Sequence, residues 1–303
     1  MFIICSVASA QLMTETFGTG ANQFSIDFVQ IGNPGNSPDT TGRPNPTGSV
    51  AYTYNLGRYE VHRDAITKAN VSGSLGIDMQ DMNGYGGNGL NRPATGISPY
   101  EAAKFVNWLN SSKGYQVAYN LTVDYFNHPT IGVWSGGQYN GNNNLRHKDA
   151  YYFLPTEDEW YKAAFFDPNK PGGLGYWNYP TVSDSAPTPV SGGLLSGTAV
   201  YGKTIYSGPA DVTNAGGLSA YGTMAQGGNV CELNESAYEY RGGAWNTSPA
   251  IPTELSVSAR YETDPFSSNY SIGFRVASVP EPSALSLLAV GLGGLAMMRR
   301  RRS

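Results

Sequence analysis

The side chains that could carry covalent chemistry are few in this chain. There are two cysteines and three histidines, namely Cys5, Cys231, His62, His128 and His147. The histidines lack the spacing of a metal site, and no G-x-S-x-G element points to a serine hydrolase. The glycine-rich GYGGNG at 84–89 lacks the strand–helix context of a phosphate site, so we interpret it as a turn or loop. If an N-terminal signal that includes Cys5 is removed, Cys231 has no partner for an intrachain disulfide.

Four segments carry a specific order of motifs. They are FLPTEDEWYKAA at Phe153–Ala164, GNVCE at Gly228–Glu232, RGGAWNTSPAIPTELSVSAR at Arg241–Arg260 and GFRVAS at Gly273–Ser278. Together they resemble the sulfatase-modifying factor, or formylglycine-generating enzyme, family. Similar motifs occur in the same order in that family, so the resemblance is specific, and it extends over Asn22–Ser278.

The resemblance implies an oxidation for which this chain lacks the residues. Family members that oxidise sulfatase cysteines carry two active-site cysteines between the GG-aromatic element and the following arginine. Counted without a gap, those positions are Thr247 and Pro252. A threonine hydroxyl has a very high pKa and proline offers no side-chain ligand, so neither can bind copper or exchange with a thiol. We therefore assign no catalytic residue and do not expect copper, and we expect Cys231 to be a small buried hydrophobe.

The resemblance also suggests a structural calcium ion. In the family, the GNVWE loop and the residue three positions before its glycine supply oxygen ligands. Carried over, Ala225, Gly228 and Val230 would offer backbone carbonyls, and Glu232 would offer a carboxylate. Ala225 replaces the family's Asn or Asp, which removes one side-chain ligand. The alternative is a metal-free loop held by hydrogen bonds.

The neighbourhood of the missing cysteines is predicted to hold a polar ligand. Trp245, Asn246, Thr247 and Tyr261 would present stacking faces and neutral hydrogen-bonding groups, which suit a sugar or an extended peptide. The alternative is that the aromatic residues fill the core.

Two arginines match the AAR and GFR segments of the family. We expect Arg260 and Arg275 to be structural, organising loops through charge-assisted hydrogen bonds. Direct contact with a ligand is the alternative for either residue.

Composition excludes some partners. The 303 residues are 40% hydrophobic, 12% aromatic and only 14% charged, with 38 glycines, which is typical of a loop-rich domain with an ample core. Without the four arginines 299–302 and Glu281, 15 basic residues stand against 22 acidic ones, a net charge of −7. Because no basic stripe with interleaved aromatics occurs, nucleic-acid binding is not expected.

Both ends of the chain indicate export. MFIICSVASA at 1–10 resembles the end of a signal peptide without its basic start, and an ordinary apolar N-terminus is the alternative. At the other end, Pro280-Glu281-Pro282 precedes an apolar run, Ala284–Met298, and four arginines. Such a helix would be about 22 Å long, short for a hydrocarbon core of about 30 Å, and the arginines would stay cytoplasmic.

This C-terminal arrangement at 279–303 resembles the PEP-CTERM sorting tail, which a membrane exosortase is thought to recognise and cut; the alternative is a plain tail anchor. The resemblance implies a periplasmic or surface location, with transient membrane insertion and cleavage near Val279–Pro282.

The expected architecture is one domain over residues 22–278. Capping boxes at Ser98–Glu101 and Thr156–Glu159 predict two helices near 98–112 and 156–165. Val50–Leu56 has the composition of a strand, whereas Phe166–Ala220 shows no sustained periodicity. The resemblance implies an α+β fold of the formylglycine-generating enzyme type, related to C-type lectins, with little regular structure.

Three functions follow from these observations. A non-catalytic binding or surface-structural protein is favoured by the missing cysteine pair, with an extracellular polysaccharide or peptide as partner. The alternatives are formylglycine generation and another protein-modifying activity on the same scaffold. Fold alone does not separate them.

Overall fold

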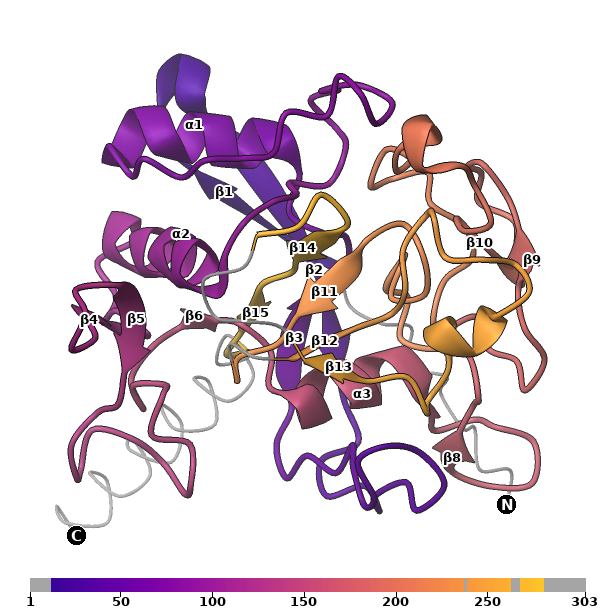
Figure 1. Cartoon of the computed structure of the whole chain (residues 1–303). Helices are drawn as coiled ribbons and strands as arrows, with labels where there is room; N and C mark the ends of the chain where they lie inside the picture. Colours follow the sequence, from indigo (N-terminus) through magenta and orange to yellow (C-terminus); the bar gives the residue numbers. More distant parts are fainter. Residues whose placement is uncertain (1–11, 237–238, 263–267, 281–303) are drawn as a thin grey trace, which may run out of the picture.

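A five-stranded antiparallel sheet joins the two ends of the folded chain in the computed structural model, which describes residues 12–236, 239–262 and 268–280 (Figure 1). The strands, in spatial order, are β1 (Leu12–Phe17), β2 (Phe24–Ile31), β3 (Tyr54–Gly57), β15 (Ala277–Ser278) and β6 (Tyr152–Phe153). The last strand, β15, therefore lies inside the sheet, between β3 and β6. The first strand, β1, precedes the predicted domain start at Asn22, and β3 covers only the end of the predicted strand 50–56.

A second, four-stranded sheet carries the motifs that point to a family. Its spatial order is β13 (Tyr261–Glu262), β12 (Glu239–Arg241), β11 (Cys231–Leu233) and β14 (Ile272–Phe274). β11 is parallel to β14 and antiparallel to β12. This sheet thus brings GNVCE, the RGGAW segment and GFRVAS side by side.

Both predicted helices are present with their caps. Helix α2 spans Pro99–Ser112 and helix α3 spans Glu157–Phe165, and each begins with a complete capping box. Helix α1 (Arg63–Gly73) is not among the predicted elements. Its N-cap is His62, whose Nδ1 accepts the N–H of Ala65 at 3.2 Å, and histidine is not a usual N-cap residue.

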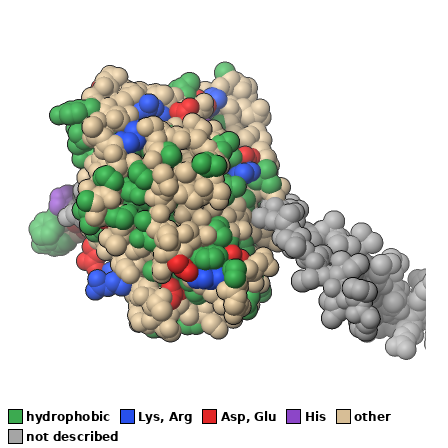
Figure 2. Space-filling model, turned by 90° about the vertical axis from the view of Figure 1, so that its right-hand side faces the viewer, with side chains coloured by type: hydrophobic (Ala, Val, Ile, Leu, Met, Phe, Trp, Pro, Cys, Tyr) green, Lys and Arg blue, Asp and Glu red, His purple; other side chains and the backbone are tan. Residues whose placement is uncertain are grey.

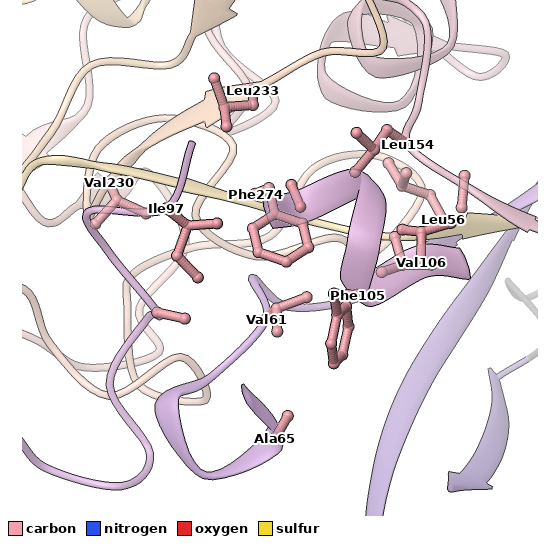
Figure 3. Packing of buried hydrophobic residues seen from close by; sticks show 14 of the residues in the cluster. Leu56, Val61, Ala65, Ile97, Phe105, Val106, Leu154, Val230, Leu233 and Phe274 are labelled. Atoms are coloured by element: carbon pink, nitrogen blue, oxygen red, sulfur yellow. The ribbon is translucent and has the colours of Figure 1, made fainter. Parts of the chain in front are cut away.

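The core lies between the helices and the two sheets (Figure 3). Phe105 of α2 stacks on Phe24 of β2, with 6.2 Å between ring centroids, and meets Phe274 of β14 edge-on at 5.8 Å. Phe105 and Phe274 are fully buried, and each such side chain contributes about 1.5–3 kcal/mol of hydrophobic free energy. One aromatic cluster therefore fixes the small sheet relative to the large one.

The remaining elements are short. They are η1 (Gly20–Asn22), β4 (Asn120–Val123), β5 (Pro129–Gly132), β7 (Phe166–Asp167), β8 (Gly175–Tyr176), β9 (Thr188–Pro189), β10 (Thr198–Ala199), η2 (Ile205–Ser207) and η3 (Pro252–Leu255). The segment 166–220 holds only two-residue strands and one short 3-10 helix, as its lack of periodicity predicts. The α+β fold with little regular structure is thus confirmed.

None of the helices in the described part of the chain is both long and apolar enough to cross a bilayer. The predicted signal remnant at 1–10 and the apolar run Ala284–Met298 lie outside the described residues.

Candidate functional site

A cavity of about 410 Å³ opens beside the small sheet, at Thr247, one of the two positions that match the family's cysteines. We call it the Thr247 pocket. Its lining is Cys231, Tyr240, Gly243, Ala244, Asn246, Thr247, Ser248, Ile251, Glu254, Tyr261, Asn269, Ser271 and Ile272. Three of the four predicted ligand residues, Asn246, Thr247 and Tyr261, thus share one cavity.

Two glycines shape the turn that builds this pocket. Gly242 and Gly243 have φ of 99° and 67°, in the region that L side chains rarely adopt. A Cβ on Gly243 would lie 2.9 Å from Leu255 Cδ1 and 3.2 Å from Thr247 Oγ1. The turn therefore needs glycine, and it delivers Asn246 and Thr247 to the cavity directly after β12.

Thr247 is a structural part of the pocket wall. Its Oγ1 accepts the N–H of Ala244 at 3.0 Å and donates to Glu254 Oε2 at 2.9 Å. Pro252 starts η3 and is not part of the described lining. The hydroxyl of Thr247 therefore ties two loops together, and neither position offers a redox-active group.

Cys231 faces the same cavity but is not poised as a nucleophile. It is a free, buried cysteine. Burial, reinforced by the carboxylates of Glu254 and Glu232, raises the pKa of Cys231 to about 12. Because the thiolate is the nucleophile and the metal ligand, a thiol with this pKa is inert near neutral pH.

Several polar groups of the pocket have no partner in the described chain. The rings of Tyr240 and Tyr261 stack with centroids 5.5 Å apart and planes 19° apart. Burial raises the pKa of both phenols, so each remains a neutral O–H. Among the described residues, neither phenol and no atom of the Asn246 amide makes a hydrogen bond. The pocket thus combines an aromatic pair with unused donors and acceptors.

Trp245, the fourth predicted ligand residue, occupies the core position that is the alternative for the aromatic residues. Its side chain is fully buried, its Nε1 donates to the carbonyl of Ile205 at 3.2 Å, and its ring meets Tyr270 edge-on. The ring fills the core and offers no stacking face to the pocket.

The residues of the predicted calcium site do not suit a divalent cation. Glu232 is completely buried, and its Oε2 accepts from Trp160 Nε1 at 2.6 Å and from Arg275 Nε at 2.5 Å. Arg275 Nη2 donates to the other carboxylate oxygen. The guanidinium therefore already neutralises this carboxylate, while Ala225, Gly228 and Val230 supply no side-chain oxygen. Within the described ranges, no group of three His, Cys, Asp or Glu side chains could hold a metal.

The two predicted structural arginines organise loops. Arg275 also donates through Nη1 to the carbonyl of Gly57 at 2.7 Å and through Nη2 to that of Met224 at 2.9 Å. Arg260 Nε donates to Glu157 Oε1 at 3.0 Å, and its Nη2 pairs with Glu239. Neither arginine lies in the described lining of the Thr247 pocket.

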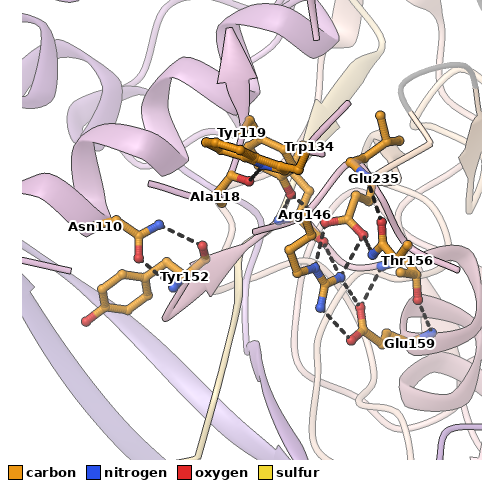
Figure 4. Close-up of polar contacts among 12 residues, drawn as sticks. Asn110, Ala118, Tyr119, Trp134, Arg146, Tyr152, Thr156, Glu159 and Glu235 are labelled. Atoms are coloured by element: carbon orange, nitrogen blue, oxygen red, sulfur yellow. Dashed lines mark hydrogen bonds and ion pairs between the residues drawn. The ribbon is translucent and has the colours of Figure 1, made fainter. Parts of the chain in front are cut away.

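A third arginine, Arg146, forms a network that no sequence pattern indicates (Figure 4). Its Nε and Nη2 donate to the two oxygens of Glu235 at 2.6 and 2.8 Å, and its Nη1 and Nη2 donate to Glu159 at 3.1 and 2.8 Å. The guanidinium also lies 3.6 Å from the ring centre of Phe153. Burial acts to raise the pKa of Glu159, but Arg146 outweighs it and the pKa is lowered. At Glu235 burial prevails over Arg146, and the pKa is raised.

Arg146 is part of the wall of a second cavity, of about 470 Å³, which we call the junction pocket. Its lining is Tyr52, Thr53, Tyr54, Asn140, Gly141, Asn143, Arg146, His147, Lys148, Ala150, Phe153, Val279 and Pro280. The last two residues end the described chain, so this cavity adjoins the start of the C-terminal tail.

The surface shown in Figure 2 is weakly charged. Lysine, arginine, aspartate and glutamate side chains are scattered among hydrophobic and uncharged ones, without a large patch of one sign. This face offers no electrostatic footprint for a nucleic acid.

Comparisons with known proteins agree with this geometry. The family model for the sulfatase-modifying factor enzyme 1-like domain matches residues 29–279, and the model for the PEP-CTERM protein-sorting motif matches residues 278–302. No curated protein matches the sequence.

Solved structures support the fold. "Treponema denticola variable protein 1" is 20% identical, with a TM-score of 0.55, and the match covers 88% of this chain and 99% of that one. The structure titled "Crystal Structure of CarF" is 18% identical, with a TM-score of 0.54, covering 84% and 99% of the two chains. At these identities the likeness shows the fold alone.

Proposed function

Because this chain belongs to the sulfatase-modifying factor enzyme 1-like domain family over residues 29–279, and carries a PEP-CTERM sorting motif, we propose that it is an exported, non-catalytic binding protein. The ligand is a neutral, polar carbohydrate segment of an extracellular polymer, and it binds in the Thr247 pocket.

The observation that carries this proposal is the unpaired lining of the pocket. Tyr240, Tyr261 and Asn246 keep hydrogen-bonding groups that no described residue uses, inside a cavity of about 410 Å³. These side chains are only partly buried, so their polar groups are open to a ligand that enters the cavity from solvent. A stacked tyrosine pair with neutral amides and hydroxyls matches the alternating apolar faces and hydroxyl edges of a sugar.

The family's oxidation is the second candidate, and the pocket chemistry argues against it. Thr247 and Pro252 hold no thiol, and the pKa of Cys231 is about 12. Incubation of the purified protein with copper and a sulfatase-type cysteine peptide should leave the mass of the peptide unchanged. Formation of the aldehyde product would show that the protein oxidises the peptide cysteine and would contradict the non-catalytic proposal.

A glycan array and a peptide library, probed in parallel, test the binding proposal. The wild type should bind a subset of neutral glycans, and Tyr261→Ala should bind the same glycans more weakly. Tyr206→Ala is a matched control, because Tyr206 is 75% exposed and lies outside the described pocket lining. Glycan binding by Tyr261→Ala at the wild-type level, or binding of the wild type to peptides alone, would show that the assignment is wrong.

A further inference from the structure

The folded domain reaches to the first residue of the sorting motif. β15 ends at Ser278 and is paired on both sides, with β3 and with β6. Val279 is still held, because its N–H donates to the carbonyl of Tyr151 at 2.9 Å and its carbonyl accepts from Asn55 Nδ2 at 3.3 Å. The motif residues Pro280-Glu281-Pro282 follow directly. No spacer therefore separates the sheet from the motif.

Covalent geometry then limits where a partner can bind the motif. A chain spans at most about 3.6 Å per residue, so Pro282 lies within about 11 Å of Val279. A partner cannot gain length by peeling the chain off the sheet unless it breaks the pairing of β15 on two sides. Any protein that holds these three residues must therefore lie against the domain surface around Val279.

That surface contains the junction pocket. Val279 and Pro280 form its wall together with residues that include Tyr52 and Asn140, and Tyr52 is 49% exposed. The charged groups of the wall are already paired, Arg146 with two buried glutamates and Lys148 with Asp149 at 2.9 Å. A cavity of about 470 Å³ with aromatic walls and neutralised charges fits an apolar or aromatic side chain better than an ion.

We propose that the junction pocket is a contact surface for the exosortase-type sorting enzyme, which inserts an apolar side chain there when it engages the motif. The sorting enzyme thus contacts the folded domain as well as the tail. This inference is independent of the function proposed for the Thr247 pocket.

Processing of the full-length chain in a host that expresses the sorting enzyme tests the proposal. Tyr52→Ala removes one wall of the pocket, and Asn140→Trp fills it from an exposed position. By pulse–chase, both variants should be shortened more slowly than wild type, by about fivefold, as expected for loss of one good interface contact. Tyr206→Ala controls for loss of an exposed tyrosine elsewhere, and thermal unfolding of the purified variants checks the fold.

A second set of variants distinguishes loss of contact with the sorting enzyme from indirect damage to the fold. Eight Gly and Ser residues inserted between Val279 and Pro280 would allow the motif to bind away from the pocket. In this background Tyr52→Ala and Asn140→Trp should be processed at the same rate as their unsubstituted parent. Equal rates for all variants in the native chain, or a defect that persists with the spacer, would overturn the proposal.

Discussion

The two faces of strand β11 differ in whether the polar side chains beside them have hydrogen-bond partners. Glu232 turns into the core, where Trp160 and Arg275 use both of its carboxylate oxygens. Its neighbour Cys231 faces the Thr247 pocket, where phenol and amide groups have no described partner. Successive side chains of a strand point to opposite faces, so one short strand serves both. The face with paired polar groups stabilises the fold, and the face with unpaired groups is the one for which we propose ligand binding.

The largest expected effect comes from breaking the paired face. Arg275→Ala leaves Glu232 as a buried charge without its cation, because both side chains are completely buried. We expect the free energy of unfolding to fall by about 3–5 kcal/mol. Urea unfolding of wild type and variant measures it, with the partly exposed Arg260→Ala as a milder control. A loss no larger than that of Arg260→Ala would contradict the distinction between the two faces.

A smaller effect should appear in the pH dependence of the Arg146 network. The pKa of Glu159 in the fold is lowered from its usual 4.5, so its ionised form contributes stability above pH 4.5, and this is lost as the pH falls through the folded pKa. Glu159→Gln should lower stability at pH 7 by about 2 kcal/mol. Its stability should also change less than that of wild type as the pH falls below 4.5. The free energy of unfolding is measured by urea unfolding at a series of pH values. If it falls by the same amount in wild type and in Glu159→Gln as the pH drops below 4.5, this role for Glu159 is refuted.

Substitutions on the unpaired face should change the affinity for a glycan and leave the free energy of unfolding nearly unchanged. Tyr261→Ala should weaken binding of an array-positive glycan by about tenfold, and Asn246→Ala by about threefold, because a stacking face is worth more than one neutral hydrogen bond. Isothermal titration provides both values. If both variants keep the wild-type affinity, or if either loses much of its stability, these residues support the fold and do not bind the ligand.

The smallest effect is an expected lack of reaction at Cys231. Since its pKa is about 12, iodoacetamide should not alkylate it between pH 7 and 9 in the folded protein. A Cys5→Ser background removes the other thiol, and mass spectrometry counts the adducts. Rapid alkylation at pH 7 would show an activated thiolate and would weaken the non-catalytic assignment.

Sequence patterns correctly predicted those elements whose structure depends on residues close together in the chain. The capping boxes at Ser98 and Thr156 specify the starts of α2 and α3, because cap and helix are neighbours in the sequence. The burial of Trp245 depends on Ile205, which lies 40 positions away, and Arg146 meets Glu235 across 89 positions. Those contacts follow from tertiary packing, which no single-sequence pattern records. The sequence therefore left both a ligand role and a core position open for Trp245, and the Arg146 network emerged only from the structure.

The most direct test of the central claim is the salt dependence of glycan binding. Neutral recognition predicts that the wild type binds an array-positive glycan with the same Kd at 50 and at about 500 mM NaCl, because stacking and neutral hydrogen bonds are not screened by salt. Tyr261→Ala should bind the same glycan about tenfold more weakly in the same titration. A Kd that rises steeply with salt, or wild-type affinity in Tyr261→Ala, would contradict neutral recognition in the Thr247 pocket.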